Sequence, residues 1–560
     1  MKSAVLALFF CIPVVLSAQE ESPTPVQYDV VGSFSFADYG YTPSFSPLSD
    51  IRVGDFDSSA AWDLAFDRES PVLFVLNRFP AALTSIDVSD PHAMEIAQKL
   101  EVAGLSAEGL ALDGSVLAVA GAADADTFEA RTESARGFVY LVAVSDITSV
   151  QTAEEAEEAG VYLELDWPIF DVALRSGRVA ALGAEGLYLA DVEDLLAGNA
   201  AGGDAWTRLD LEIGADEMLS QVKVEFSAGG DTVYASFPAA NRVVRINAAD
   251  GTLLSDGDLG LKDFADARRP VAQPNRAADA GETRPVGIDP SDRDGTISIL
   301  PAPITGRFEP LDFAVIDAGG RELLVSANGG VLTGIDASAA GAGARTAVRV
   351  EEAQLDAELE DELEAGEGLD SVGRLFVVPS AGGTDNDGDI DRLVASGARS
   401  FSIFDHSLSL VFDSWDLIEH LVATIAPFTF NASPYSTRFD AESPTTGPGP
   451  SAVAGRYMGE GRVLVAVGLR SPGGVMFFRV RLDTGDVAFL GYKHNRNWDM
   501  ALTEEGEFRF PERAGHLGPR RMIFLDPDAD AGRPNLVLAV ANHNSGTVEL
   551  YEETSPYYWE

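Results

Sequence analysis

Short β-rich runs recur in pairs along most of this 560-residue chain. Each pair consists of an apolar run, a polar turn and a second apolar run, and a polar break follows it. The clearest pairs are Val72–Leu76 with Thr84–Val88, Val116–Val119 with Phe138–Val142, Val179–Leu182 with Leu187–Leu189, Thr232–Ala235 with Val243–Ile246, Val463–Val467 with Val475–Phe478, and Leu536–Val540 with Val548–Tyr551. A repeat of roughly 50 to 75 residues is typical of a ring of similar β-sheets that carry inserted loops.

The pattern predicts an all-β fold, a β-propeller with seven blades and with loop and short-helix insertions. Eight blades are the alternative, because Leu323–Asn328 and Phe401–Phe404 belong either to one inserted blade or to two. We expect the run Tyr28–Phe36 to add a strand to the last blade, which would close the ring and hide its edges. A pair of β-sandwiches is the alternative architecture, and residues 19–560 are expected to form one domain.

Residues 1–18 have the features of a secretory signal peptide. Lys2 supplies the positive end, Ala4–Val15 the apolar run, and Ser17–Ala18 a small-residue cleavage region. The only cysteine, Cys11, lies inside this segment, so the mature chain would have neither a thiol nor a disulfide. No later run reaches the roughly 18 apolar residues that a spanning helix needs. We therefore expect an exported protein, periplasmic or extracellular, with no membrane span.

The chain is strongly acidic. It has 39 Lys and Arg against 89 Asp and Glu, a formal net charge of −50. Such a surface repels nucleic acid and anionic membranes, so we expect no nucleic-acid partner. It suits a salty or cation-rich exterior, where counterions screen the self-repulsion. Salt adaptation and a specific function explain the charge equally well, and both interpretations remain open.

Carboxylates alternate at the start of the stretch Gly382–Ser414. They are Asp385, Asp387, Asp389 and Asp391. Like charges at this spacing repel one another unless a cation or full solvation relieves them, and Ca²⁺ takes six to eight oxygen ligands from such loops. The sequence therefore predicts a calcium site, with a solvated acidic turn as the alternative. An EF-hand is excluded because Ile390 holds its glycine position and Ser396 its bidentate-acid position, so further ligands must come from elsewhere.

A second acidic turn is another candidate cation site. It carries Asp289, Asp292 and Asp294. Three carboxylates beside Pro290 and Gly295 could bind Ca²⁺, but Arg293 could equally neutralise them, and we leave both possibilities open.

The insertion at about residues 351–370 carries ten acids and no base. Leu355, Leu359 and Leu363 recur at helical spacing, which predicts a short helix with one apolar edge lying on a blade. A docking element for a basic partner is the alternative.

Several motifs together resemble the choice-of-anchor I family of secreted bacterial propeller proteins. The resemblance runs from about Ser58 to Tyr551, and the segments that carry it are Gly382–Asp405, Leu259–Asp263, Gly287–Gly295, Gly306–Asp312, Leu323–Asn328 and Ala539–Val548. It implies a β-propeller, and some members are described as an atypical alkaline phosphatase.

The chain departs from this family at three acidic motifs. The family's PEPEG, ANEGD and LGPEG correspond here to Gly449–Val453, Ala327–Gly330 and Leu517–Arg521. The resemblance implies that these acids line the channel and hold metal, and carboxylates also serve as general acids and bases. HExxH, GxSxG-elbow and phosphate-loop motifs are also missing. We therefore assign no catalytic residue.

The sequence favours an exported, non-catalytic propeller that binds a protein or glycan partner and is stabilised by calcium. We expect a monomer that is exported freely, since no sorting tail follows the last expected strand. The predicted partner-binding residues are Arg496, Trp498, Arg520 and Arg521, because Arg and Trp are favoured anchors at interfaces. Arg496 could instead clamp neighbouring blades through an ion pair. A secreted metal-dependent phosphoesterase is the alternative function.

Overall fold

The computed structural model describes residues 45–78, 81–101, 105–123, 136–197, 205–211, 221–265, 268–270, 283–332, 347–365, 372–383, 385, 387–497, 509–527 and 535–554. These residues contain seven four-stranded antiparallel sheets. Each sheet is built mainly from strands that follow one another in the sequence. The repeat in the sequence therefore corresponds to a repeat of sheets.

The first four sheets, in chain order, consist of β2 (Asp63–Asp67), β3 (Val72–Asn77), β4 (Ala82–Asp87) and β5 (Glu95–Glu101); β6 (Leu105–Asp113), β7 (Val116–Ala123), β8 (Gly137–Ala143) and β9 (Val161–Leu165); β10 (Ile169–Arg175), β11 (Arg178–Gly183), β12 (Gly186–Asp191) and β13 (Thr207–Asp210); and β14 (Lys223–Phe226), β15 (Thr232–Phe237), β16 (Arg242–Asn247) and β17 (Leu253–Asp258).

The other three consist of β22 (Asp312–Asp317), β23 (Glu322–Asn328), β27 (Ser400–Asp405) and β28 (Leu410–Asp413); β29 (Pro450–Tyr457), β30 (Arg462–Leu469), β31 (Val475–Arg481) and β32 (Val487–Lys493); and β33 (Pro519–Leu525), β34 (Val537–Asn542), β35 (Thr547–Glu553) and β1 (Phe45–Arg52).

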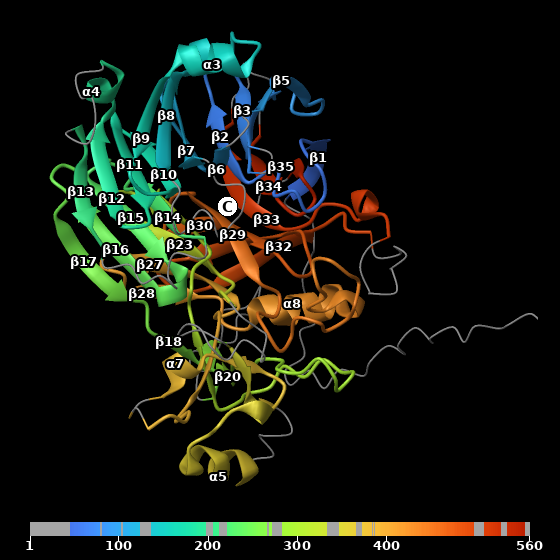
Figure 1. Ribbon diagram of the computed structural model, residues 1–560. Coiled ribbons are helices and arrows are strands. Elements are labelled where there is room, and N and C mark those ends of the chain that lie inside the picture. Colours follow the sequence, from blue (N-terminus) through green and yellow to red (C-terminus); the bar gives the residue numbers. More distant parts are fainter. Residues whose placement is uncertain are drawn as a thin grey trace, which may run out of the picture.

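The sheets form a closed ring. Their first strands contact one another in the order β2, β6, β10, β14, β22, β29 and β33, and β33 contacts β2 again. Figure 1 shows the sheets arranged around this common axis. The predicted β-propeller is confirmed. Because the described residues leave gaps, the number of blades in the whole chain stays a prediction.

The strands Leu323–Asn328 and Phe401–Phe404 lie in one sheet. β23 pairs with β27 in antiparallel register, Leu323 opposite Asp405 and Asn328 opposite Ser400. The residues between these two strands therefore form an insertion within a single sheet.

An amino-terminal strand completes the last sheet. β1 pairs antiparallel with β35, with Phe45 opposite Glu553 and Arg52 opposite Thr547. Phe45 is 1 % exposed, and its ring stacks on Phe477 of the neighbouring sheet with centroids 4.2 Å apart. The predicted closing run Tyr28–Phe36 lies outside the described residues, and the outer position in the last sheet belongs to β1.

Burial explains the apolar runs that make the strands recognisable. All six residues of β34 are buried, and all but the first residue of β30 are buried or nearly so. These middle strands pack on both faces between neighbouring sheets, so their sequences lack a polar alternation. Outer strands such as β5 and β17 are mostly exposed and polar.

The insertions form a second, smaller layer beside the ring. They contribute the sheet β18 (Leu261–Asp263), β21 (Ile304–Arg307), β26 (Leu393–Ala395), β25 (Phe376–Val377) and β24 (Val348–Arg349), and the pair β19 (Arg268–Pro270) and β20 (Thr283–Pro285). Over the whole described part of the chain, the helices and 3₁₀ turns are α2 (Val144–Ile147), α3 (Ala153–Ala159), α4 (Val192–Leu196), α5 (Ala357–Ala365), α7 (Pro379–Gly382), α8 (Leu417–Ile425), η3 (Pro238–Ala240), η4 (Val350–Glu352), η5 (Pro427–Thr429) and η6 (Pro511–Arg513). In Figure 1 the elements α5, α7, β18 and β20 gather below the ring.

Helix α5 is the helix predicted in the acidic insertion. Leu359 and Leu363 are 6 % and 1 % exposed and join the apolar core of this layer, with Leu355 packed against it, so the helix lies on the insertion layer and not on a blade as expected. The acidic side chains of the helix point away from this core. Among the described residues, no helix has the length and apolar character needed to cross a membrane.

Candidate functional site

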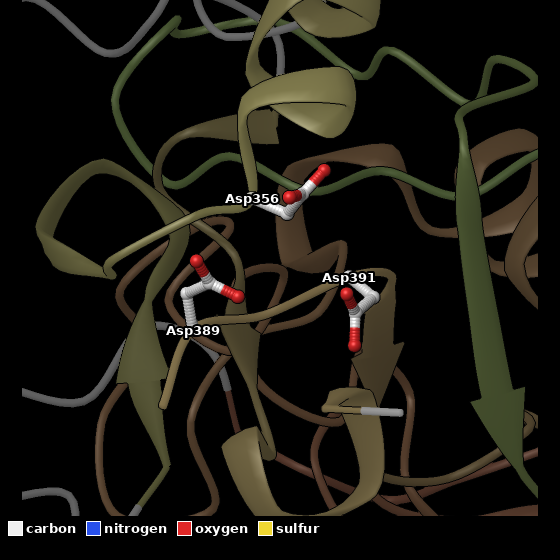
Figure 2. Close-up of side chains that lie close together, drawn as sticks. All are labelled: Asp356, Asp389 and Asp391. Carbon is white, nitrogen blue, oxygen red and sulfur yellow. The ribbon is translucent and has the colours of Figure 1, made fainter. Parts of the chain in front are cut away.

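The acidic loop after α7 meets the start of α5. Asp356 donates its backbone N–H to the carbonyl oxygen of Ile390 at 3.0 Å, and Ile390 donates to Gln354 at 3.0 Å. This parallel pairing places Asp356 beside Asp389 and Asp391, as Figure 2 shows. One carboxylate oxygen from each of the three lies within 4.8 Å of the others. Asp356, from the acidic insertion, is therefore placed where it could supply the further ligand that the predicted site would need.

A second group overlaps the first. Asp385, Asp387 and Asp389 also have carboxylate oxygens within 4.8 Å of one another. The backbone N–H of Asp387 donates to Asp385 Oδ1 at 3.2 Å, and that of Asp389 donates to Asp387 Oδ1 at 3.3 Å. The two groups share Asp389, whose Oδ1 is buried without a hydrogen-bond partner among the described residues. An oxygen-preferring cation fits this donor set.

The electrostatics of the loop show how closely the carboxylates crowd. A hydrogen bond with Asp387 raises the pKa of Asp389 to about 6, and the charges of Asp387, Asp356 and Asp391 act in the same direction. The same hydrogen bond lowers the pKa of Asp387.

The second predicted acidic turn does not bring its carboxylates together. Asp292 is paired with Arg374 at 2.9 Å and with Arg438 at 3.0 Å, rather than with the adjacent Arg293. Asp294 accepts the backbone N–H of Thr296 at 3.0 Å at an exposed position. Neither close acidic group in the described part of the chain contains a residue of this turn.

Asp289 of this turn points into the protein instead. It is 0 % exposed, and its two carboxylate oxygens accept backbone N–H groups of Ser291 at 3.3 Å and Ser298 at 2.8 Å. Burial raises the pKa of Asp289 to about 7, and the nearby charge of Glu419 adds to the effect. Burial likewise raises the pKa of Asp440 to about 9, with the charge of Asp289 as the next cause.

Carboxylates on the innermost strands connect neighbouring sheets. Asp63 on β2 accepts the backbone N–H of Leu110 on β6 at 2.9 Å. Asp171 on β10 accepts that of Val224 on β14 at 2.7 Å. A third contact of the same kind links Asp312 on β22 to the N–H of Val453 on β29 at 2.9 Å. In each case the carboxylate reaches the next sheet around the ring.

Two of these carboxylates, Asp312 and Asp63, form ion pairs across the axis. Lys223 Nζ lies 2.6 Å from Asp312 Oδ1, and Arg521 lies 3.3 Å from Asp312 and 3.2 Å from Asp63. Arg521 also lines a cavity of about 600 Å³ between β14, β22, β29 and β33, where Glu225 and Arg456 contribute further charges. The sequence predicted Arg521 as a partner anchor. In the structure it lies inside the ring, where it pairs with Asp63 and Asp312.

Sequence reasoning missed these axial carboxylates. Each lies between two apolar residues where an innermost strand begins, as in Trp62-Asp63-Leu64, Phe170-Asp171-Val172 and Leu311-Asp312-Phe313. A recurring Asp inside an apolar run was the available signal, because an isolated charge there needs a partner.

Two arginines enclose Trp62. The guanidinium carbons of Arg78 and Arg520 lie 4.4 Å and 4.5 Å from the centre of the indole ring. Arg78 also pairs with Glu108 at 2.9 Å, and Trp62 Nε1 donates to the Glu108 carbonyl oxygen at 2.9 Å. Like-charged guanidiniums this close need the aromatic faces and an anion to compensate their repulsion.

His543 adds a neutral side chain to this cluster. Its ring stands edge-on to Trp62 at 5.7 Å, and its Nδ1–H donates to the carbonyl oxygen of Gly518 at 2.7 Å. Burial lowers the pKa of His543 to about 4, and the charges of Arg520, Arg470 and Arg78 lower it further. Three arginines therefore gather here in a chain with a net charge of −50.

The other predicted anchors have different placements. Arg496 is 4 % exposed and donates to the carbonyl oxygens of Ser471, at 2.6 Å, and of Ser433 and Ser436. Its guanidinium therefore joins three loop segments inside the fold. Trp498 lies outside the described residues.

Residues 223–483 match the family model of the choice-of-anchor I domain. This match confirms the resemblance indicated by the sequence motifs over the middle part of the chain. The curated proteins contain no match to the chain.

The comparison with solved structures finds propellers at low TM-scores. The propeller domain of Cps50 (Swd1) from Myceliophteria thermophila has 10 % identity and a TM-score of 0.40, with 91 % of this chain and 100 % of that chain covered. The WD40 propeller of Doa1 has 8 % identity and a TM-score of 0.40, covering 93 % and 100 %. At such TM-scores the fold assignment rests on the sheet order and on the contacts that close the ring.

Proposed function

The protein carries a choice-of-anchor I domain, and from this premise we propose that it is an exported, non-catalytic β-propeller that binds a protein or glycan partner through an acidic group of that partner. The observation that carries the proposal is the stack of Arg78, Trp62 and Arg520. Arginine and tryptophan are the residue types that dominate binding energy at interfaces. Arginine also forms strong, charge-assisted hydrogen bonds to carboxylates, sulfates and phosphates.

The contacts made by the axial carboxylates favour a binding function over catalysis. Asp63, Asp171 and Asp312 each accept a backbone N–H from the next sheet. Asp63 and Asp312 are also ion-paired with Arg521. Carboxylates committed in this way are poorly placed to act as general acids or bases. Arg520 stands where the family motif LGPEG has its acid, so the local charge is reversed there.

Binding of a polyanion tests the role of Arg520. We expect the protein to bind sulfated dextran or polyglutamate at low salt and not to bind neutral dextran. Arg520→Glu should weaken this binding at least about tenfold, the effect of losing about 1.4 kcal/mol. The measurement is isothermal titration calorimetry.

Arg136→Glu is the matched control, because this variant makes the same charge change at an exposed residue directly before β8. Equal weakening by both variants would reduce the effect to net charge and contradict the proposal. Robust metal-dependent hydrolysis of a phosphomonoester by the purified protein would favour the phosphoesterase alternative instead.

We further propose that the acidic loop binds Ca²⁺ through Asp356, Asp389 and Asp391, with Asp385 and Asp387 close by. The supporting observation is the convergence of oxygens from two segments that are far apart in the sequence. A cation bound there would hold the insertion layer together, because it would join the start of α5 to the loop that leads into β26.

Calcium removal tests this site. We expect chelation to lower the Tm of the protein, because an ion that binds only the folded state stabilises that state. Asp389→Asn should remove most of the difference between the calcium-loaded and chelated proteins, since Asp389 belongs to both acidic groups. A calcium-dependent Tm that persists in full in this variant would rule out the loop as its source.

A further inference from the structure

Arg399 lies at the centre of a buried polar chamber between the ring and the insertion layer. It is 1 % exposed, and its Nη1 donates to Glu419 Oε1 at 2.7 Å and to the carbonyl oxygen of Asp289 at 2.9 Å. Its Nη2 donates to the carbonyl oxygens of Ser443 and Thr445 at 2.5 Å and 3.2 Å. These contacts join four segments of the chain around one guanidinium.

Two side-chain oxygens in this chamber have no hydrogen-bond partner among the described residues. They are Asp440 Oδ2 and Asn431 Oδ1. Asp440 is 1 % exposed and Asn431 is 0 % exposed. Both side chains flank the hydroxyl of Ser443, which accepts from Asn431 Nδ2 at 2.9 Å and donates to Asp440 Oδ1. A buried oxygen without a donor is costly, so each such oxygen calls for a ligand.

Carboxyl groups outnumber basic side chains around Arg399. Asp289, Glu419 and Asp440 are all at most 1 % exposed, while Arg399 supplies one guanidinium. A buried carboxylate without a compensating cation is destabilising, so each of these groups either keeps its proton or faces a cation. Asn431 Nδ2 also donates to Glu419 Oε1 at 3.0 Å, which directs the amide oxygen of Asn431 away from that carboxylate.

The backbone holds these side chains in place at a cost. Arg399, Asn431 and Asp440 have positive φ angles of 53°, 43° and 64°. Asn and Asp tolerate this region, but a bulky Arg adopts it rarely. Such strain persists only where the surrounding structure fixes the residue.

We propose that this chamber binds one divalent cation of the Ca²⁺ class, with Asp440 Oδ2 and Asn431 Oδ1 as protein ligands. In this proposal the buried carboxyl groups of Asp289 and Glu419 balance the ion's charge from outside its coordination shell. Water completes the six to eight oxygens that Ca²⁺ takes. Carboxylate and amide oxygens without thiolate or imidazole select a hard cation.

Native mass spectrometry of the full chain, loaded with Ca²⁺ and then freed of excess ion, tests this proposal. The Asp440→Asn variant keeps the size of the side chain and removes its charge. It should hold one Ca²⁺ fewer than the unmodified protein. Asp483→Asn, at an exposed carboxylate paired with Arg481, is the matched control and should hold the same number. An unchanged number of bound Ca²⁺ ions in Asp440→Asn would overturn the chamber site. The two unpartnered oxygens would then contact water or carry a proton.

The Asp389→Asn variant gives an independent answer, because it leaves the chamber intact. Retention of one Ca²⁺ by this variant supports the chamber site, and complete loss of Ca²⁺ overturns it, whether or not Asp440→Asn folds. The acidic loop is judged separately, since its failure would leave Asp389→Asn with the same count as the unmodified protein. The two proposed sites therefore stand or fall on different measurements.

Discussion

Asp171 shows how one carboxylate both joins two sheets and makes the ring sensitive to pH. It accepts the N–H of Val224, and burial raises its pKa from the usual 3.8 to about 8, with the charge of Asp63 acting in the same direction. Because the pKa is higher in the folded state, the carboxyl group contributes stability below about pH 4, and this contribution is lost as the pH rises through about 8. We therefore expect the Tm to fall over this pH range, and Asp171→Asn to reduce the fall. The Asn side chain keeps an oxygen that can accept from Val224.

The measurement is a series of melting curves against pH for both proteins. Asp210→Asn, at a carboxylate that is 79 % exposed, is the control and should leave the slope unchanged. Parallel pH profiles for Asp171→Asn and the unmodified protein would show that Asp171 titrates normally.

At the scale of the element, strand β1 holds the last sheet against its neighbour. Phe45 at the start of this strand is fully enclosed and stacks on Phe477 of β31. Phe45→Ala should lower the free energy of unfolding by about 3–5 kcal/mol, because it removes a buried aromatic side chain and leaves a cavity. Ile96→Ala is a suitable comparison, since Ile96 lies on outer strand β5 and is 42 % exposed.

Chemical denaturation of the two variants distinguishes a closing strand from a peripheral one. A loss for Phe45→Ala no larger than that for Ile96→Ala would mean that β1 adds little to the ring.

At the scale of the whole molecule, charge is distributed unevenly. The chain carries 89 acids and 39 Lys and Arg, yet several basic residues are placed where sheets meet. Lys223 and Arg521 neutralise the axis, Arg399 the chamber, and Arg78 and Arg520 enclose Trp62. The outer surface is therefore more acidic than the interior, which favours binding sites for cations outside and anchors for anions near the axis.

The ring was predictable from the sequence because its middle strands are buried on both faces. Their apolar runs, such as Val463–Val467, stand out from the polar turns around them. The approach of Asp356 to the acidic loop was not predictable, because it depends on the pairing of Leu355 with Ile390 across an insertion. The axial Asp63 was missed for a related reason, since its partner Arg521 comes from the opposite end of the chain.

The pairing of β1 with β35 has a consequence for how the molecule is made. Phe45 and Glu553 are partners, so the last sheet cannot assemble until nearly the whole chain is available. A chain that emerges from its amino terminus first presents β1 long before its partner strand. Closing so long a loop carries an entropic cost, and contacts of such high sequence separation form slowly. The other described sheets can assemble before β1 meets its partner strand, and closure of the ring is the late step that turns an open arc into the finished propeller.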